Sequence, residues 1–288
     1  MDGACTQGVD TGFVTLGAVK VAILGVVQGI TELMPISSTA HMRLVPALLG
    51  WPDPGSAFSA TMQLAALSAV VCYFWRDIRA ITGGSLSAIA TRDWHSTELR
   101  LAIGIILGTI PIVIAGVLLA PMLNACGSPL RTLPVIGFAC LIMGALLAVA
   151  EVACRHVRNT EDMRLRDALI VGVAQVGALI PGVSRSGSTL TAALFRDFAR
   201  EEAARFSFLL GLPAIALAGL HEVATLVRAH LPLEGWTILA VGVVVGSLSS
   251  FAALWSLMRI LERFSTWPFI AYRILLGAVV LWVSVISM

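Results

Sequence analysis

Two polar inserts interrupt this otherwise apolar chain, and their side chains could do chemistry. The first insert, at residues 26–41, carries a carboxylate, an imidazole and several hydroxyl groups, and its most reactive members are Glu32, Ser38 and His41. The second insert, at residues 181–189, adds Arg185 and more hydroxyl groups. Ionisable residues inside membrane-spanning sequence are costly, so they usually mark a functional site. The combination suits the binding and cleavage of a phosphate ester or anhydride whose other end is apolar.

The first insert is predicted to be a broken helix. Gln28 and Glu32 are four residues apart and therefore share one helical face. Pro35 should end that helix, because proline removes a backbone donor and disfavours helical structure in the residue before it. Ser37 or Ser38 can then cap a second helix, whose free N–H groups and positive dipole end favour an anion.

The second insert repeats this arrangement. Pro181 should break the helix, Ser184 or Ser186 should cap the next one, and Arg185 should lie beside the anion site. If the two inserts meet, two helix N-termini and a guanidinium converge on one point. That point suits a diphosphate, because guanidinium–phosphate bonding is planar and often bidentate. The further side chains expected to bind substrate there are Gln28, Ser37, Thr39, Gln63, Ser184, Ser186 and Thr189.

Several roles stay open for these residues. Glu32 is either a ligand for Mg²⁺ or Ca²⁺, which prefer oxygen ligands, or a general base. Ser38 is the candidate nucleophile, and His41, on the same helical face, would activate its hydroxyl or serve as nucleophile itself. Glu32 and Arg185 could instead form only a structural ion pair. A single hydroxyl in a membrane helix usually bonds its own helix or a neighbouring one, and Gln63 is equally explained by a helix–helix hydrogen bond.

Composition places both inserts in a membrane. The 288 residues are 58% hydrophobic and 12% charged, whereas soluble proteins are about 45–50% apolar and about 25% charged. Apolar runs long enough to cross a bilayer recur along the chain, so residues 1–288 are predicted to form one integral, all-α, polytopic membrane domain. The six expected transmembrane helices cover about residues 58–75, 101–120, 133–153, 206–227, 236–258 and 269–286.

Two further apolar regions, about residues 20–50 and 168–195, contain the inserts and are predicted to be re-entrant helical hairpins, because broken backbone is tolerated at membrane depth only inside protein or beside a cavity.

Thirteen arginines fall in four connecting segments, residues 76–100, 154–167, 196–205 and 259–268. The segments on the opposite side contain only Arg131 and Arg228. The positive-inside rule therefore predicts that both termini lie outside and that the hairpins enter from opposite sides.

The two hairpins also align with each other at an offset of 147 residues. The aligned pairs are Gln28 and Gln175, Ser37 and Ser184, Ser38 and Arg185, and Thr39 and Ser186. This pattern predicts an inverted repeat, and corresponding broken segments in such repeats mark a site near the membrane midplane. The two repeats would cover about residues 20–153 and 168–286. Two independent proline-kinked helices are the alternative.

Together the Gln28-x-x-x-Glu32 spacing and the two inserts resemble the bacterial undecaprenyl-diphosphate phosphatase family, which is also known for bacitracin resistance. The resemblance covers nearly the whole chain, including residues 206–210 and the pair Tyr272-Arg273, which by itself would be read as a structural or interfacial anchor. It implies a multi-pass enzyme of the bacterial inner membrane with two re-entrant hairpins and a site open to the periplasm. Such enzymes remove one phosphate from the C55 isoprenoid diphosphate and so recycle the carrier for cell-wall synthesis.

The resemblance also implies which residues act. It places Glu32, Ser38, His41 and Arg185 in the site, with Mg²⁺ or Ca²⁺ as activator. One departure concerns Gln28, because relatives often have glutamate at this position. Glu32 is therefore the only carboxylate of the motif, which weakens a metal site built from two carboxylates.

The expected partners are undecaprenyl diphosphate and membrane lipids; a homodimer is one option, and no nucleic acid is expected. A transporter or flippase of a phosphorylated lipid is the main alternative function, because inverted repeats with broken helices are also transporter architecture and a fold does not decide function. Acid-phosphatase-like lipid phosphatases are disfavoured, since their basic motif followed by Pro-Ser-Gly-His is missing from the sequence.

Overall fold

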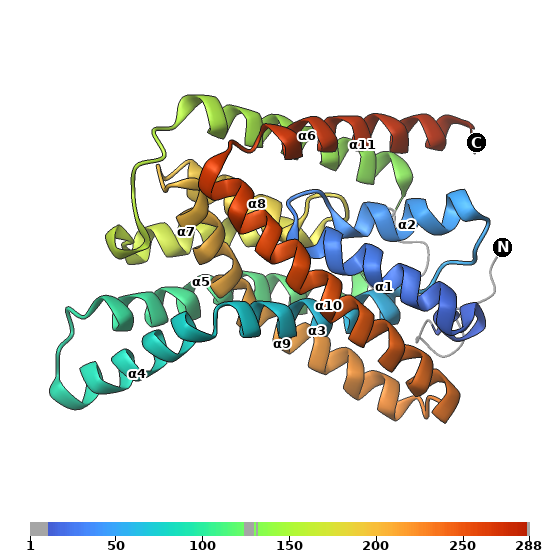
Figure 1. Cartoon of the computed structure of the whole chain (residues 1–288), viewed down its shortest axis with the longest axis horizontal. Helices are drawn as coiled ribbons and strands as arrows, with labels where there is room; N and C mark the ends of the chain where they lie inside the picture. The colour runs from blue at the N-terminus through green and yellow to red at the C-terminus, as the bar shows by residue number, and fades with distance from the viewer. Residues whose placement is uncertain (1–10, 124–129, 131, 287–288) are drawn as a thin grey trace.

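The structure is a computed structural model that describes residues 11–123, 130 and 132–286, and within these residues it consists of helices (Figure 1). The described residues form no β-strand beyond a single bridge between Arg158 and Phe198. The elements in chain order are η1 (Gly12–Leu16), α1 (Gly17–Leu33), α2 (Ser38–Leu49), α3 (Ser56–Tyr73), α4 (Trp75–Thr91), α5 (Thr97–Leu123), α6 (Leu133–Ala153), η3 (Thr160–Asp162), α7 (Leu165–Gln175), η4 (Val176–Leu179), α8 (Arg185–Leu194), α9 (Arg200–Arg228), α10 (Leu233–Arg263) and α11 (Trp267–Ile286).

Six helices of the described chain are long and apolar enough to cross a membrane, which confirms the predicted all-α polytopic class. Five of them, α5, α6, α9, α10 and α11, match expected spans. The sixth is formed by η1 and α1 together, Gly12–Leu33, and was not among the expected spans. It is long enough to cross a membrane because helical structure begins at residue 12 rather than near residue 20. The expected span at residues 58–75 is α3, which passes the same test only together with α4, and the two helices are bent by 73°.

Both polar inserts form the predicted break between two helices. Ser37 and Ser184 stand at the N-caps of α2 and α8, and each has a positive φ, 74° and 69°. The two hydroxyl groups accept hydrogen bonds from the N–H groups of Ala40 and Gly187, at 3.4 and 3.2 Å. Positive φ is uncommon for residues with a side chain. Its occurrence at two positions aligned by the 147-residue offset supports the inverted repeat.

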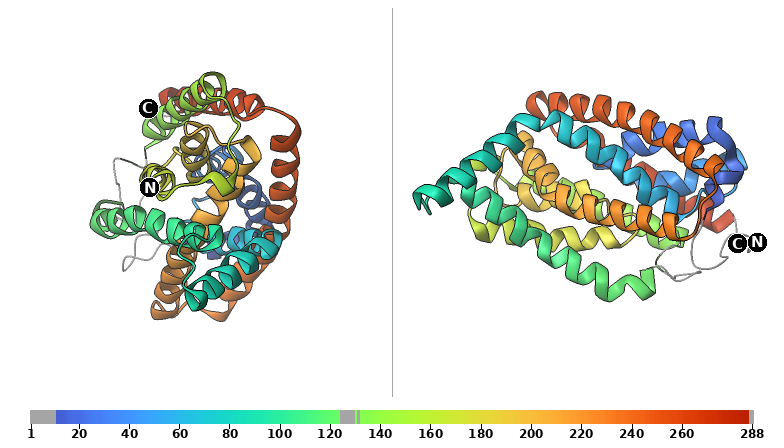
Figure 2. Two further views of the ribbon diagram at one scale, coloured as in Figure 1. Left: turned by 90° about the vertical axis from the view of Figure 1, so that its left-hand side faces the viewer. Right: turned by 90° about the horizontal axis from the view of Figure 1, so that it is seen from below.

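The hairpins enter the molecule from opposite ends. In Figure 1 the α1–α2 hairpin lies toward the end that carries both termini, whereas α7 and α8 lie toward the other end. Seen along the long axis, the α1–α2 hairpin, in blue, lies in the middle of the molecule (Figure 2, left), whereas α7 keeps one face exposed through Leu169 and Val173. The first arm of each hairpin packs on a long helix, α1 on α10 and α7 on α5, while α3 packs on α9 and α6 on α11.

Glycines let α1 approach α10 closely. A Cβ atom on Gly25 would lie 2.8 Å from the carbonyl oxygen of Gly242, and one on Gly29 would overlap Ser249 and the Gly246 carbonyl. Small residues at such interfaces are the usual way for membrane helices to pack backbone against backbone. The close approach fixes the position of α1 and therefore of the carboxylate near its end.

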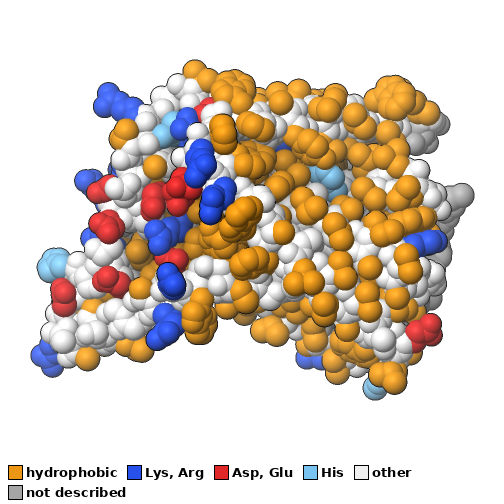
Figure 3. Space-filling view, viewed as in Figure 1, with side chains coloured by type: hydrophobic (Ala, Val, Ile, Leu, Met, Phe, Trp, Pro, Cys, Tyr) orange, Lys and Arg blue, Asp and Glu red, His pale blue; other side chains and the backbone are white. Residues whose placement is uncertain are grey.

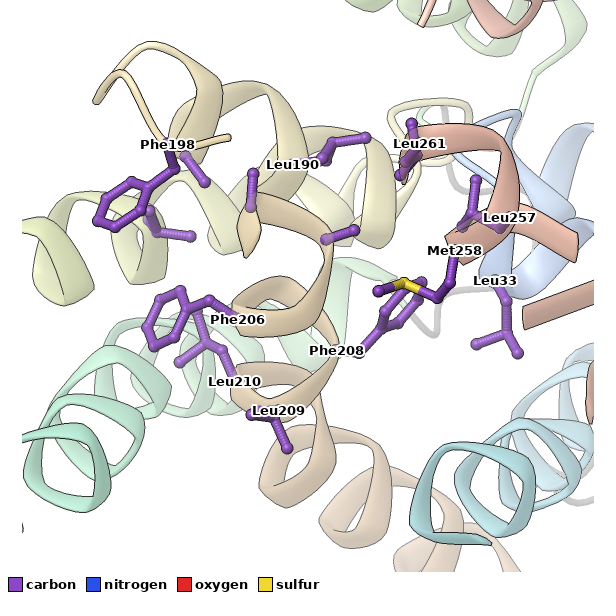
Figure 4. Close-up of a cluster of buried hydrophobic side chains, with 14 of the residues drawn as sticks. Leu33, Leu190, Phe198, Phe206, Phe208, Leu209, Leu210, Leu257, Met258 and Leu261 are labelled. Atoms are coloured by element: carbon purple, nitrogen blue, oxygen red, sulfur yellow. The ribbon is translucent and has the colours of Figure 1, made fainter. Parts of the chain in front are cut away.

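A large hydrophobic cluster holds the second hairpin and α9 together (Figure 4). Phe206, Phe208 and Leu210 from α9 are at most 2% exposed, and Leu190 from α8 packs in the same cluster. Leu33, the last residue of α1, also belongs to it. Dense packing of this kind leaves little freedom for the loops at its edge.

Charged side chains gather mainly at the end of the molecule away from the termini, and apolar side chains cover much of the remaining face (Figure 3). Several of these charges are paired: Asp167 accepts hydrogen bonds from Arg158 and Arg196, both at 2.7 Å. Burial opposes ionisation of Asp167, but the two guanidinium groups outweigh it and hold its pKa at about 2. This end carries the segments that the positive-inside rule assigns to the cytoplasm.

Candidate functional site

The carboxylate of Glu32 is the point at which the two hairpins meet. It lies in the last turn of α1 and is 7% exposed. Its Oε2 accepts hydrogen bonds from Gln28 Nε2 at 3.0 Å and from Ser38 Oγ at 2.7 Å. Its Oε1 accepts one from Arg185 Nη2 at 3.2 Å. Three donors from three helices therefore converge on one carboxylate; the spacing predicted that Gln28 and Glu32 share a helical face, whereas the approach of Ser38 and Arg185 depends on the meeting of the two hairpins.

The loops of the two hairpins also hold each other through hydroxyl groups at equivalent positions. The N–H of Gly182 donates to Thr39 Oγ1 at 3.0 Å, and Ser186 Oγ donates to the carbonyl of Met34 at 3.2 Å. Thr39 and Ser186 are aligned by the 147-residue offset. Each hairpin thus satisfies a backbone group in the break of the other, which removes the cost of burying that group unpaired.

Arg273 joins the two breaks from α11. Its side chain is 1% exposed and donates to the carbonyls of Pro35 at 3.1 Å, Gly182 at 3.0 Å and Val183 at 2.9 Å. Of the two anchor interpretations of this arginine, the structural one is confirmed and the interfacial one is wrong. The sequence signal for a buried role was an arginine inside an apolar span. Its partners could not be predicted, because they lie about 90 and 240 residues away along the chain.

A cavity of about 170 Å³ opens beside Glu32. Its polar wall consists of six of the predicted site residues, Glu32, Ser38, Thr39, Gln63, Ser184 and Arg185. Its apolar wall comes from α5, η4 and α9 and consists of Ile112, Ala178, Leu179, Ala214, Ile215 and Ala218. These apolar residues were not predicted, because nothing in their types distinguishes them from other membrane residues. A site with one polar and one apolar wall suits an amphipathic substrate.

Space for Arg185 is provided by a glycine in α9. A Cβ atom at Gly211 would overlap Nη1 of Arg185. The guanidinium is therefore held between α9 and Glu32, and its side chain is 12% exposed. An arginine in this position can hold a carboxylate in the free protein and a phosphate when substrate is bound.

His41 has a different environment from the one expected. Its Nδ1 lies 2.7 Å from the carbonyl oxygen of Ser37, and its Nε2 lies 2.7 Å from the hydroxyl of Tyr272, whose ring stacks on the imidazole. The expected contact with the Ser38 hydroxyl is not formed, because that hydroxyl donates to Glu32. Tyr272 was missed as a neighbour of the site, since it is 231 residues from His41.

The remaining predicted residues surround the cavity without lining it. Thr189 bonds the carbonyl of Arg185 at 2.8 Å and the hydroxyl of Ser207. Ser37 bonds Thr39 at 3.2 Å, as Ser184 bonds Ser186 at 3.3 Å. These bonds fix the two N-caps. The substrate-binding roles of these residues stay predictions.

Oxygen donors are present for a hard divalent cation. Among the described residues there is no cluster of three or more His, Cys, Asp or Glu side chains that could hold a metal. Glu32 is accompanied instead by Oε1, the side-chain amide oxygen of Gln28, which is buried and has no hydrogen-bond partner. A carboxylate, an amide oxygen and phosphate oxygens of a substrate are ligands of the kind that Mg²⁺ and Ca²⁺ prefer. The residues present therefore fit such an ion in a substrate complex.

Comparison with known proteins gives concordant matches. The family described as bacitracin resistance protein BacA matches residues 21–279. An undecaprenyl-diphosphatase 2 of Mesorhizobium japonicum is 66% identical over 254 residues, which are 88% of this chain and 96% of the relative. Undecaprenyl-diphosphatases of Gloeobacter violaceus and Synechococcus elongatus are 50% and 46% identical, and the matches cover 92% and 90% of this chain and 91% and 90% of the relatives.

Proposed function

The chain belongs to the bacitracin resistance protein family, and we propose the way in which its hairpin site carries out the reaction of that family. The protein is a multi-pass membrane enzyme that hydrolyses undecaprenyl diphosphate to undecaprenyl phosphate and inorganic phosphate. Recycling of the lipid carrier for cell-wall synthesis and resistance to bacitracin follow from this reaction. The observation that supports our proposal most directly is the convergence of Glu32, Ser38 and Arg185 on one amphipathic cavity.

The substrate would lie with its diphosphate against the polar wall and the first part of its prenyl chain against the apolar wall. Arg185 would then exchange its bond to Glu32 for phosphate oxygens, because guanidinium binds phosphate in a bidentate manner. The N-termini of α2 and α8 would add backbone N–H groups and the positive ends of two helix dipoles. The polar wall would thereby balance much of the negative charge of the diphosphate.

Ser38 is the proposed nucleophile and Glu32 its general base. The Ser38 hydroxyl already donates to Glu32 Oε2 at 2.7 Å, which is within the range needed for proton transfer. As Ser38 Oγ bonds the terminal phosphorus, its proton passes to Glu32 and the bond to the bridging oxygen breaks, so that undecaprenyl phosphate leaves. Glu32 passes this proton to the departing undecaprenyl phosphate and so becomes a carboxylate again. It then takes a proton from a water molecule as the water oxygen bonds the phosphorus, and it returns that proton to Ser38 Oγ as the phosphoserine bond breaks, which releases inorganic phosphate. His41 would act by fixing the Ser37 carbonyl at the start of α2 rather than by touching the reacting atoms.

A divalent cation, Mg²⁺ or Ca²⁺, is proposed as cofactor. Glu32, the free amide oxygen of Gln28 and the phosphate oxygens would hold it. When bound, the ion neutralises charge on the diphosphate.

We also propose the location of the enzyme. The arginine distribution supports insertion with both termini outside, and the bacterial relatives support the inner membrane. The site would then open toward the periplasm. All catalytic groups proposed here come from one chain, so the reaction does not require a homodimer.

Hydrolysis can be separated from lipid transport by one serine. Ser38→Ala should abolish phosphate release from undecaprenyl diphosphate by the purified protein with Mg²⁺ or Ca²⁺ present. Ser68→Ala is the matched control, because Ser68 bonds Ser247 on the outer side of α3 and does not line the cavity. A Ser38→Ala protein with wild-type turnover would overturn the role of Ser38, and a folded wild type without turnover would favour the transporter.

A further inference from the structure

A second cavity adjoins the reaction cavity, and the reaction proposed above does not use it. Its volume is about 60 Å³, which is room for a few water molecules. Thr39 lines both cavities, and the second one continues past it to Arg43, Asp53 and Ser59. Arg43 is one helical turn beyond Thr39 on α2, and α2 runs toward the end of the molecule that carries the termini (Figure 1).

Arg43 is held in this cavity by a weak partner. It forms an ion pair with Asp53, and the two side chains are 38% and 44% exposed. Asp53 is fixed independently, because its Oδ1 accepts a hydrogen bond from the N–H of Gly55 at 2.9 Å. In the described part of the chain Arg43 makes no hydrogen bond besides the one to Asp53. An ion pair as exposed as this one contributes little to stability, so an incoming anion can replace the carboxylate.

We propose that Arg43 binds the inorganic phosphate product on its way to water, and that Asp53 competes with phosphate for the guanidinium. The proposal rests on the proposed function, which releases a phosphate anion beside Ser38 and Thr39. The anion must leave through a polar route, because the other wall of the reaction cavity is apolar. A guanidinium one turn beyond Thr39 is the group best suited to receive it. Asp53 then displaces phosphate and restores the free protein.

The same ion pair could have only the structural role of tying α2 to the loop after it, and the two roles predict different results. If the pair is only structural, removing either partner breaks the same bond, and both variants change in the same direction. If Arg43 binds phosphate, removing Arg43 weakens phosphate binding, whereas removing the charge of Asp53 eliminates a competitor and strengthens it.

The experiment measures the inhibition constant of inorganic phosphate during hydrolysis of farnesyl diphosphate by the purified full-length protein. Arg43→Ala should raise this constant about fivefold, the scale of one partly exposed charge-assisted contact. Asp53→Asn should lower it about threefold, and Arg43→Lys should give an intermediate value. Arg228→Ala is the control, because Arg228 is exposed at the same end of the molecule but lines neither cavity.

Three results would overturn the proposal: a wild-type enzyme that phosphate does not inhibit, an unshifted constant in Arg43→Ala, or shifts of the same sign in Arg43→Ala and Asp53→Asn. Thermal unfolding of each variant shows that the measured protein is folded. A wild-type protein that hydrolyses no diphosphate would overturn the proposed function itself, which is a different result from an unshifted constant in an active enzyme.

Discussion

Replacing Glu32 by glutamine should remove nearly all hydrolytic activity while leaving the protein folded. The carboxylate accepts hydrogen bonds from Gln28, Ser38 and Arg185. An amide of the same shape has one accepting oxygen, and its NH₂ group would face one of these donors. It also cannot take a proton from Ser38. General-base catalysis contributes about 10²–10⁴-fold, so the activation barrier should rise by about 3–5 kcal/mol.

The assay is the initial rate of phosphate release from farnesyl diphosphate at saturating substrate, with the divalent ion fixed. Glu98→Gln is the matched control, since Glu98 accepts a hydrogen bond from Ser96 at the opposite end of the molecule from the termini. The rate of this variant should stay within about twofold of the wild-type rate, the scale of a surface contact. Thermal unfolding in detergent, with and without a diphosphate, tests whether the variant folds. A folded Glu32→Gln protein that kept more than about a tenth of wild-type kcat would refute the role of Glu32 as base, because general-base catalysis contributes at least about 10²-fold.

Three further predictions follow from the hydrogen bond to His41, from the contact between α1 and α10, and from the ion pairs of Asp167. Tyr272→Phe removes the hydroxyl that bonds His41, so kcat should fall about twofold to tenfold, the value of one hydrogen bond; an unchanged kcat would contradict a positioning role. Gly29→Ala should lower the free energy of unfolding by about 1–3 kcal/mol because its methyl group overlaps α10, whereas Gly83→Ala, which meets nothing within 4 Å, should not destabilise the protein. The depressed pKa of Asp167, about 2, gives about 2 kcal/mol of stability that is present above about pH 4 and lost as the pH falls toward 2. Thermal unfolding at several pH values should show this loss in wild type and a flatter profile in Asp167→Asn.

Local signals in the sequence were sufficient to predict the two hairpin breaks. Pro35 and Pro181 exclude helix through backbone sterics, and the serines after them cap the next helix through bonds that span only three residues. Such features depend on neighbours in the chain and can therefore be read without the fold. The convergence of Glu32 with Arg185 needed one further assumption, that the two hairpins meet.

Contacts between distant segments could not be predicted in the same way. Tyr272 beside His41 and the apolar wall of the cavity depend on how whole helices pack, and their residue types are common throughout the chain. The same limit applies to α3 and α4. An apolar run of suitable length predicts a span, but composition does not show the 73° bend after Tyr73.

The bonds between the hairpins explain why the site needs both of them. Each break leaves polar backbone groups inside the membrane domain. Thr39 of the first hairpin and Ser186 of the second each bond a backbone group in the other hairpin's break. Arg273 bonds backbone carbonyls in both breaks. Neither hairpin could keep its loop at that depth alone without leaving buried backbone groups unpaired. The geometry that places Ser38 against Glu32 and Arg185 is therefore a consequence of satisfying the backbone. A substitution that separates the loops, such as Arg273→Ala, should accordingly impair catalysis and folding together, whereas Ser38→Ala should impair catalysis alone.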